Sequence, residues 1–127
     1  MKNTDPEPVE VANRVKVFEH IKNDKPYLQF DFKGHLDHSN AIKAIEEWRR
    51  YMEGSSKKNL IYNCKEMTGF DSSARKIWQA TMGEFKQRTG SIWIISSNVF
   101  ILGAAKTMGV LTGFLIKVAK TTSEIKD

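Results

Sequence analysis

The N-terminal part of the chain alternates apolar and polar residues in a way that predicts a β-hairpin. Residues 15–21 form one stretch rich in valine and aromatic side chains, and residues 28–33 alternate leucine and phenylalanine with polar residues. A period of two places every second side chain on one face of a strand, so both stretches are predicted to be strands, the second of them half-buried. The Asn-Asp-Lys-Pro sequence at 23–26 is typical of the turn between them.

Three later segments carry apolar residues at helical spacing. Their inner positions are Ile42, Ile45, Trp48 and Met52 in the first, Ala74, Ile77, Trp78, Thr81, Met82 and Phe85 in the second, and Ile101, Ala104, Ala105, Met108 and Leu111 in the third. Such spacing places them on one face of a helix that packs on a core. We expect Ser39 or Asn40 to cap the first helix and Ser97 or Asn98 the third.

Short apolar runs separate these helices. Residues 60–62 and 91–95 are predicted to be strands covered on both faces, and the alternation at 114–118 predicts a last strand before a final helix that starts near 121–124. Residues 34–40 and 68–70 are expected to be loops. The order β-β-α-β-α-β-α-β indicates an α/β fold with a mixed, mostly parallel sheet of about five strands, backed by helices.

Composition limits the domain organisation and the compartment. The 127 residues suffice for one domain, expected at 13–127, after a polar, flexible lead-in at 1–12 that has no signal-peptide core. The apolar stretch at 92–119 is interrupted by Lys106, which favours core elements over a membrane span. A single cysteine, Cys64, fits a reducing compartment, and we expect a cytoplasmic protein.

The charge distribution does not indicate nucleic-acid binding. The net charge is +5, but the lysines and arginines are scattered and form no dense basic stripe with interleaved aromatic residues. The three tryptophans, at 48, 78 and 93, are therefore interpreted as core or interface residues. No nucleic-acid partner is predicted.

The residues that could support catalysis or metal binding are few. His35, Asp37 and His38 could contribute zinc ligands, but their spacing matches no standard motif, so a solvated loop is the favoured interpretation. Cys64 ends a predicted central strand, where a buried and inert thiol is expected. No phosphate-binding or dinucleotide-binding glycine motif occurs. We predict no enzyme activity, metal or cofactor.

One candidate site remains at 68–75, with the sequence TGFDSSAR. Asp71, Ser72 and Ser73 stand where the second helix begins, and Arg75 follows within its first turn. Unpaired N–H groups and the positive end of the helix dipole favour anions there. The hydroxyls could carry a covalent phosphate or contact a bound one, or Asp71 or a serine could simply cap the helix.

These segments resemble the STAS domain family of anti-sigma factor antagonists and sulphate transporters. GHLDHSN resembles the family's glycine-x-leucine-aspartate loop, and LIYNCKEMTGFDSSA resembles its central strand and Asp-Ser-Ser/Thr-Gly loop. Ala74 replaces the motif's glycine, Arg75 an apolar residue, and Asn63 a strand aspartate. These departures are typical of a divergent, sporulation-protein-like branch that resembles lipid-transfer (CRAL-TRIO) folds.

The resemblance implies a bacterial, non-enzymatic regulatory module that binds a protein partner. That partner would be an anti-sigma factor or a kinase-like regulator, and phosphorylation of Ser72 would switch the binding. The alternative is a carrier of a lipid or small apolar ligand. Its cavity of about 300 Å³ or more would be lined by Ile101, Met108, Leu111 and Phe114. A homodimer is left open.

Overall fold

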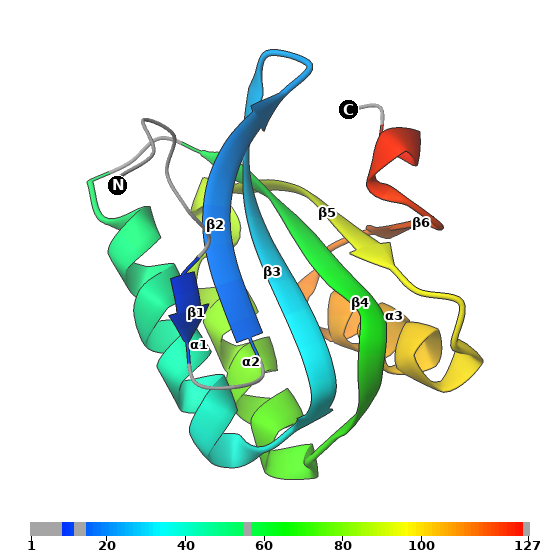
Figure 1. Cartoon of the computed structure of the whole chain (residues 1–127). Coiled ribbons are helices and arrows are strands. Elements are labelled where there is room, and N and C mark those ends of the chain that lie inside the picture. Colours follow the sequence, from blue (N-terminus) through cyan, green and yellow to red (C-terminus); the bar gives the residue numbers. More distant parts are fainter. Residues whose placement is uncertain (1–8, 12–14, 55–56, 126–127) are drawn as a thin grey trace, which may run out of the picture.

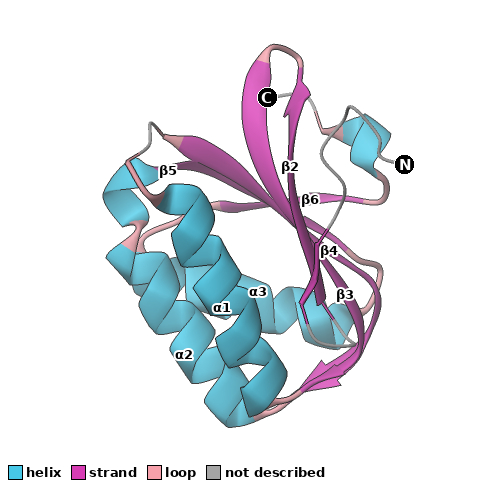
Figure 2. Ribbon diagram, turned by 60° about the vertical axis from the view of Figure 1, so that its left-hand side comes forward, coloured by secondary structure: helices cyan, strands magenta, loops and turns pink. Residues whose placement is uncertain are grey.

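A computed structural model describes residues 9–11, 15–54 and 57–125, which form one sheet with three α-helices on one of its faces (Figures 1 and 2). The strands are β1 (Val9–Val11), β2 (Val15–Lys22), β3 (Lys25–Leu36), β4 (Lys58–Phe70), β5 (Thr89–Ile95) and β6 (Ile116–Ala119). The helices are α1 (His38–Met52), α2 (Ser72–Glu84) and α3 (Val99–Thr112), with 3-10 turns η1 (Lys86–Arg88) and η2 (Thr122–Glu124).

The strands follow one another across the sheet in chain order, from β1 to β6. The pairs β1–β2 and β2–β3 are antiparallel, and the three pairs from β3 to β6 are parallel. The predicted mixed, mostly parallel α/β fold is confirmed. The additional strand, β1, lies in the expected lead-in at 1–12, most of which falls outside the described residues.

The main core lies between the sheet and the three helices. Phe30 of β3 packs edge-on against Trp48 of α1 and Trp78 of α2. The centroid of the Phe30 ring lies 5.2 Å from the ring centroid of each tryptophan. The two indoles are themselves 5.1 Å apart. These tryptophans are therefore core residues, as predicted, and they join α1 and α2 to the middle of the sheet.

The opposite face of the sheet has a smaller apolar cluster. Ile125, which follows η2, is 1% exposed and packs with Tyr27 of β3, Ile61 of β4 and Ile95 of β5. As a result, all three residues of the run at 60–62 are buried in a strand inside the sheet. The prediction that this run is covered on both faces is confirmed.

Several predicted element ends were wrong. Residues 34–36 and 68–70 are not loops, because the parallel pairing of β3 with β4 continues to Leu36 and Phe70 through two irregularities in register. Contrary to the prediction, the first helix is not capped by Ser39 or Asn40. Its cap is Asp37, whose carboxylate accepts a hydrogen bond from the Asn40 N–H at 2.8 Å. Asn98 does cap α3, as predicted. The last predicted helix is only the turn η2.

The inner face of α3 differs in one position from the prediction. Ile101 and Ala105 are buried, as expected, but Leu111 is 62% exposed. The helix is apolar on nearly all sides, so the spacing of its apolar residues does not define which side faces the core.

Candidate functional site

The candidate site lies where β3 and β4 end side by side and α1 and α2 begin. Leu36 and Phe70, the last residues of the two strands, are paired in the sheet. The N–H of Asp71 donates a hydrogen bond of 2.9 Å to the carbonyl of Leu36, so the two strand-to-helix connections are joined directly. This contact brings the segments at 34–40 and 68–75 of the sequence together at one end of the molecule.

The two helices are capped differently. Asp71 stands at the N-cap position of α2 in an extended conformation, but its carboxylate makes no capping hydrogen bond. Instead, Oδ1 of Asp71 lies 2.8 Å from Nε2 of His35, and both side chains are about half exposed. The hydrogen bond from His35 lowers the pKa of Asp71, with smaller contributions in the same direction from His38. The first-turn N–H groups of α2 therefore have no side-chain cap from Asp71.

The two serines of the motif are accessible. Ser72 and Ser73 are exposed in the first turn of α2, whereas the next residue, Ala74, is fully buried. Arg75 is half-buried, and its guanidinium donates a hydrogen bond of 3.3 Å to Gln79 one turn later. Of the predicted site residues, the serines are exposed to solvent and Arg75 is half-buried.

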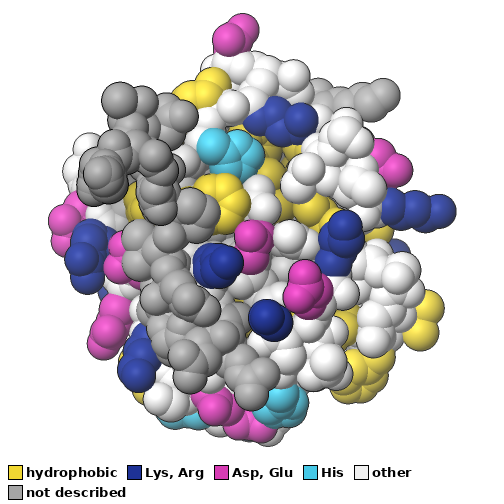
Figure 3. All heavy atoms as spheres, in the orientation of Figure 1, with side chains coloured by type: hydrophobic (Ala, Val, Ile, Leu, Met, Phe, Trp, Pro, Cys, Tyr) yellow, Lys and Arg dark blue, Asp and Glu magenta, His cyan; other side chains and the backbone are white. Residues whose placement is uncertain are grey.

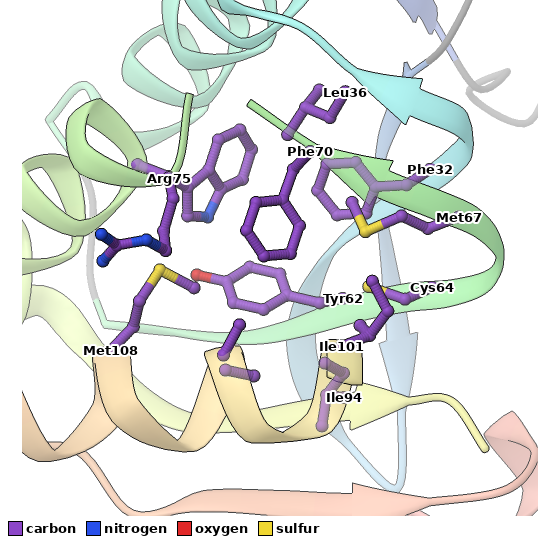
Figure 4. Close-up of a pocket in the computed structure, with 13 residues that line it drawn as sticks. Phe32, Leu36, Tyr62, Cys64, Met67, Phe70, Arg75, Ile94, Ile101 and Met108 are labelled. Carbon is purple, nitrogen blue, oxygen red and sulfur yellow. The ribbon is translucent and has the colours of Figure 1, made fainter. Parts of the chain in front are cut away.

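Arg75 borders an apolar cavity between α2, α3 and the end of β4 (Figure 4). The lining residues are Phe32, Leu36, Tyr62, Cys64, Met67, Phe70, Arg75, Trp78, Ile94, Ile101, Ala104, Ala105 and Met108. Two groups of candidate residues that are far apart in the sequence thus share one cavity: Arg75 from the serine motif, and Ile101 and Met108 from the apolar helix. Leu111 and Phe114, also predicted to line a cavity, do not border this one.

The cavity is small and its wall contains one unusual polar group. Its volume is about 50 Å³, far below the roughly 300 Å³ expected of a ligand-binding pocket. The carrier hypothesis is therefore unsupported. The hydroxyl of Tyr62 is buried and makes no hydrogen bond of normal geometry among the described residues, although a contact with the Trp78 side chain acts on its pKa. Figure 4 shows the hydroxyl on the side where Arg75 and Met108 lie. Burial raises the pKa of this phenol, so it stays protonated.

The other residues considered in the sequence have structural surroundings. Cys64 is 5% exposed, and burial raises the pKa of its thiol to about 12. Within the described ranges, no three histidine, cysteine, aspartate or glutamate side chains are arranged to hold a metal ion. No helix in the same ranges is both long enough and apolar enough to cross a membrane.

Sequence reasoning found the serine motif but missed the residues around it. His35 was considered only as a metal ligand, although it binds Asp71 across 36 positions of the chain. The sequence pattern predicts only a strand at Tyr62 and a loop at Phe70, and it indicates no role in a site for either residue. One feature of the sequence does point to Tyr62: it is a tyrosine within an apolar strand. A buried phenol usually needs a hydrogen-bond partner, so such a residue is a candidate for a polar group inside the core.

Comparisons with known proteins identify the fold. No family model matches the sequence, and no curated protein matches it. A DUF3478-family protein with a SpoIIAA-like fold from Shewanella loihica PV-4 is similar in structure, with a TM-score of 0.75 and 14% identity over 87% of this chain and 90% of that chain. The anti-sigma factor antagonist SpoIIAA in its unphosphorylated form has a TM-score of 0.53 and 16% identity, over 85% and 91% of the two chains. The chain therefore has a SpoIIAA-like fold, which is the STAS-like architecture expected from the sequence.

Proposed function

We propose that this chain is a non-enzymatic, cytoplasmic bacterial regulator that binds a protein partner through the surface around Asp71 and Ser72. The partner class is an anti-sigma factor or a kinase-like regulator, and phosphorylation of Ser72 switches the binding. The observation that carries the proposal is the exposed Ser72 at the start of α2 in a SpoIIAA-like fold. The similarity to an anti-sigma factor antagonist supports the same class of function.

The surroundings of Ser72 suit a phosphate. A phosphoserine adds roughly −1.5 to −2 charges at neutral pH, and the N-terminus of a helix favours negative charge. Arg75 and Lys76 follow three and four residues later, on the same side of the helix as Ser72. Because Asp71 is held by His35, its carboxylate does not occupy the first-turn N–H groups of α2.

The switch would act by changing the charge and the contacts of this surface. Before phosphorylation, Arg75 and Lys76 can pair with acidic groups of a partner. A phosphate on Ser72 would compete for these two cations and would repel an acidic partner surface. The fold would be nearly unaffected, because Ser72 is exposed and a negative charge is tolerated at this helix position.

The test compares partner binding by three variants of the tagged protein expressed in its source organism. Ser72→Asp and Ser72→Ala should change the amount of the same co-purifying partner in opposite directions. Ser73→Asp is the matched control, because Ser73 is also exposed and the substitution adds the same charge one residue later. Equal binding by the two Ser72 variants, or an equal effect of Ser73→Asp, would argue against a switch at Ser72.

A further inference from the structure

The helix α3 exposes far more apolar surface than a helix that covers one side of a sheet requires. Among its 14 residues, Lys106 is the only charged one. Val99 is 83% exposed and Val110 79%, and Phe100 and Leu111 are 66% and 62% exposed. In Figure 3, hydrophobic side chains gather at the lower right, over the N-terminal end of this helix. A surface helix normally has charged or polar residues on its outer face.

The outermost residues of α3 form a regular seam. Val99, Gly103, Lys106 and Val110 are all exposed, and their spacing of four, three and four residues is that of the contact positions in a pair of packed helices. The spacing is also symmetric about a point between residues 104 and 105. A second copy of α3 that runs antiparallel would therefore place Val99 opposite the partner's Val110, and Gly103 opposite the partner's Lys106.

The chemistry of each opposing pair is compatible with contact. Val99 and Val110 would bury apolar surface against each other at both ends of the seam. At Gly103 a Cβ atom would meet nothing within 4 Å, so this position leaves open space above the helix. The aliphatic part of the opposing lysine can lie in that space while its ammonium group reaches water at the edge. Phe100 and Leu111 share one flank, and their midpoint lies one residue beyond that of the seam, so they would face each other across the axis with a small offset along the helices.

The size of the patch fits a stable dimer. From their exposed fractions, Val99, Phe100, Val110 and Leu111 together present on the order of 500 Å² of surface, near the upper limit for apolar patches on monomers. A specific interface of standard size buries roughly 800 Å² per partner, so these four residues present more than half of that area. The pattern is self-complementary, as a two-fold interface requires.

We propose that the outer face of α3 binds a second copy of this chain, with the two α3 helices antiparallel across a two-fold axis. The only charges on the seam are the two Lys106 side chains, which repel each other. Added salt screens this repulsion, so it should strengthen the dimer and not weaken it. The interface does not include Ser72, although its residue Phe100 stacks on Phe70 with ring centroids 5.7 Å apart. The proposed switch does not depend on the dimer, so a chain that stays monomeric would leave it unaffected.

Sedimentation equilibrium of the purified chain between about 1 and about 100 µM tests the proposal. We expect a monomer–dimer equilibrium that Val110→Glu weakens by about tenfold or more, because a carboxylate would be buried against Val99. Ile21→Glu is the matched control, since Ile21 is 69% exposed on β2, away from α3. Circular dichroism verifies that both variants are folded.

A charge pair tests the antiparallel arrangement. Val99→Lys alone should weaken the dimer, and adding Val110→Glu in the same chain should restore it, because the two substituted positions face each other across the axis. A parallel pair would place like charges opposite each other and would show no restoration. A wild-type chain that stays monomeric over the whole range, or a Val110→Glu variant that dimerises like wild type, would overturn the proposal.

Discussion

The two aspartates that precede α1 and α2 allow a direct test of the site geometry. The carboxylate of Asp37 accepts a hydrogen bond from the Asn40 N–H at 2.8 Å, whereas the carboxylate of Asp71 makes no capping hydrogen bond to α2 and pairs with His35. Replacing a capping aspartate by alanine costs about 1 kcal/mol, within a range of roughly 0.5–2 kcal/mol. For a chain of this length, that corresponds to a decrease in melting temperature of about 3 to 5 °C.

We therefore expect Asp37→Ala to lower the free energy of unfolding by about 1 kcal/mol, and Asp71→Ala to lower it clearly less. The assay is urea unfolding at neutral pH, followed by circular dichroism, with all variants at the same concentration. His35→Ala is the informative control: without its imidazole partner, Asp71 is free to turn toward the helix, so this variant should be close to wild type. A loss for Asp71→Ala equal to that for Asp37→Ala would refute the assignment of two different caps.

Three further predictions concern packing, reactivity and pH. Gly109→Ala should destabilise the fold, because its Cβ would lie 2.7 Å from a side-chain atom of Ile116 in β6 and 2.8 Å from the carbonyl oxygen of Phe114. A Cβ at Gly103 in the same helix meets no atom within 4 Å, so Gly103→Ala should be neutral or stabilising in dilute solution. Cys64, with its pKa raised to about 12 by burial, should resist alkylation at pH 8 in the native state and react on unfolding, as followed by mass spectrometry. Asp71 has a lowered pKa in the folded state, so the stability it adds is present above its usual pKa of 3.8 and is lost as the pH falls below that value. The unfolding curves of wild type and Asp71→Asn should therefore converge in acid, and a constant difference would contradict the pairing with His35.

The sheet and its helices could be predicted because their apolar positions repeat with the period of the element. The alternation at 28–33 and the buried run at 60–62 correspond to β3 and β4. The ends of these strands could not be predicted, because Gly34 and Gly69 interrupt the apolar pattern while the backbone pairing continues. Strand pairing depends on a neighbouring strand, and a local sequence pattern does not contain that neighbour.

The candidate site could be predicted only where its residues are adjacent in sequence. Asp71 and Ser72 were identified because they precede an apolar helical pattern, and both do stand at the start of α2. The contact of His35 with Asp71 and the position of Tyr62 beside Arg75 arise from the packing of separate elements. The exposure of Leu111 was missed for a different reason, since a helix that is apolar on nearly all sides has no unique inner face.

Phosphopeptide mass spectrometry of the protein purified from its source organism tests the regulatory account most directly. The account predicts a fraction of molecules with one phosphate, located on Ser72 and absent from the Ser72→Ala variant. It also predicts that this fraction changes with growth conditions, because a regulatory switch must be set and reset. An unmodified Ser72 under every growth condition, or a phosphate located only on other residues, would contradict it.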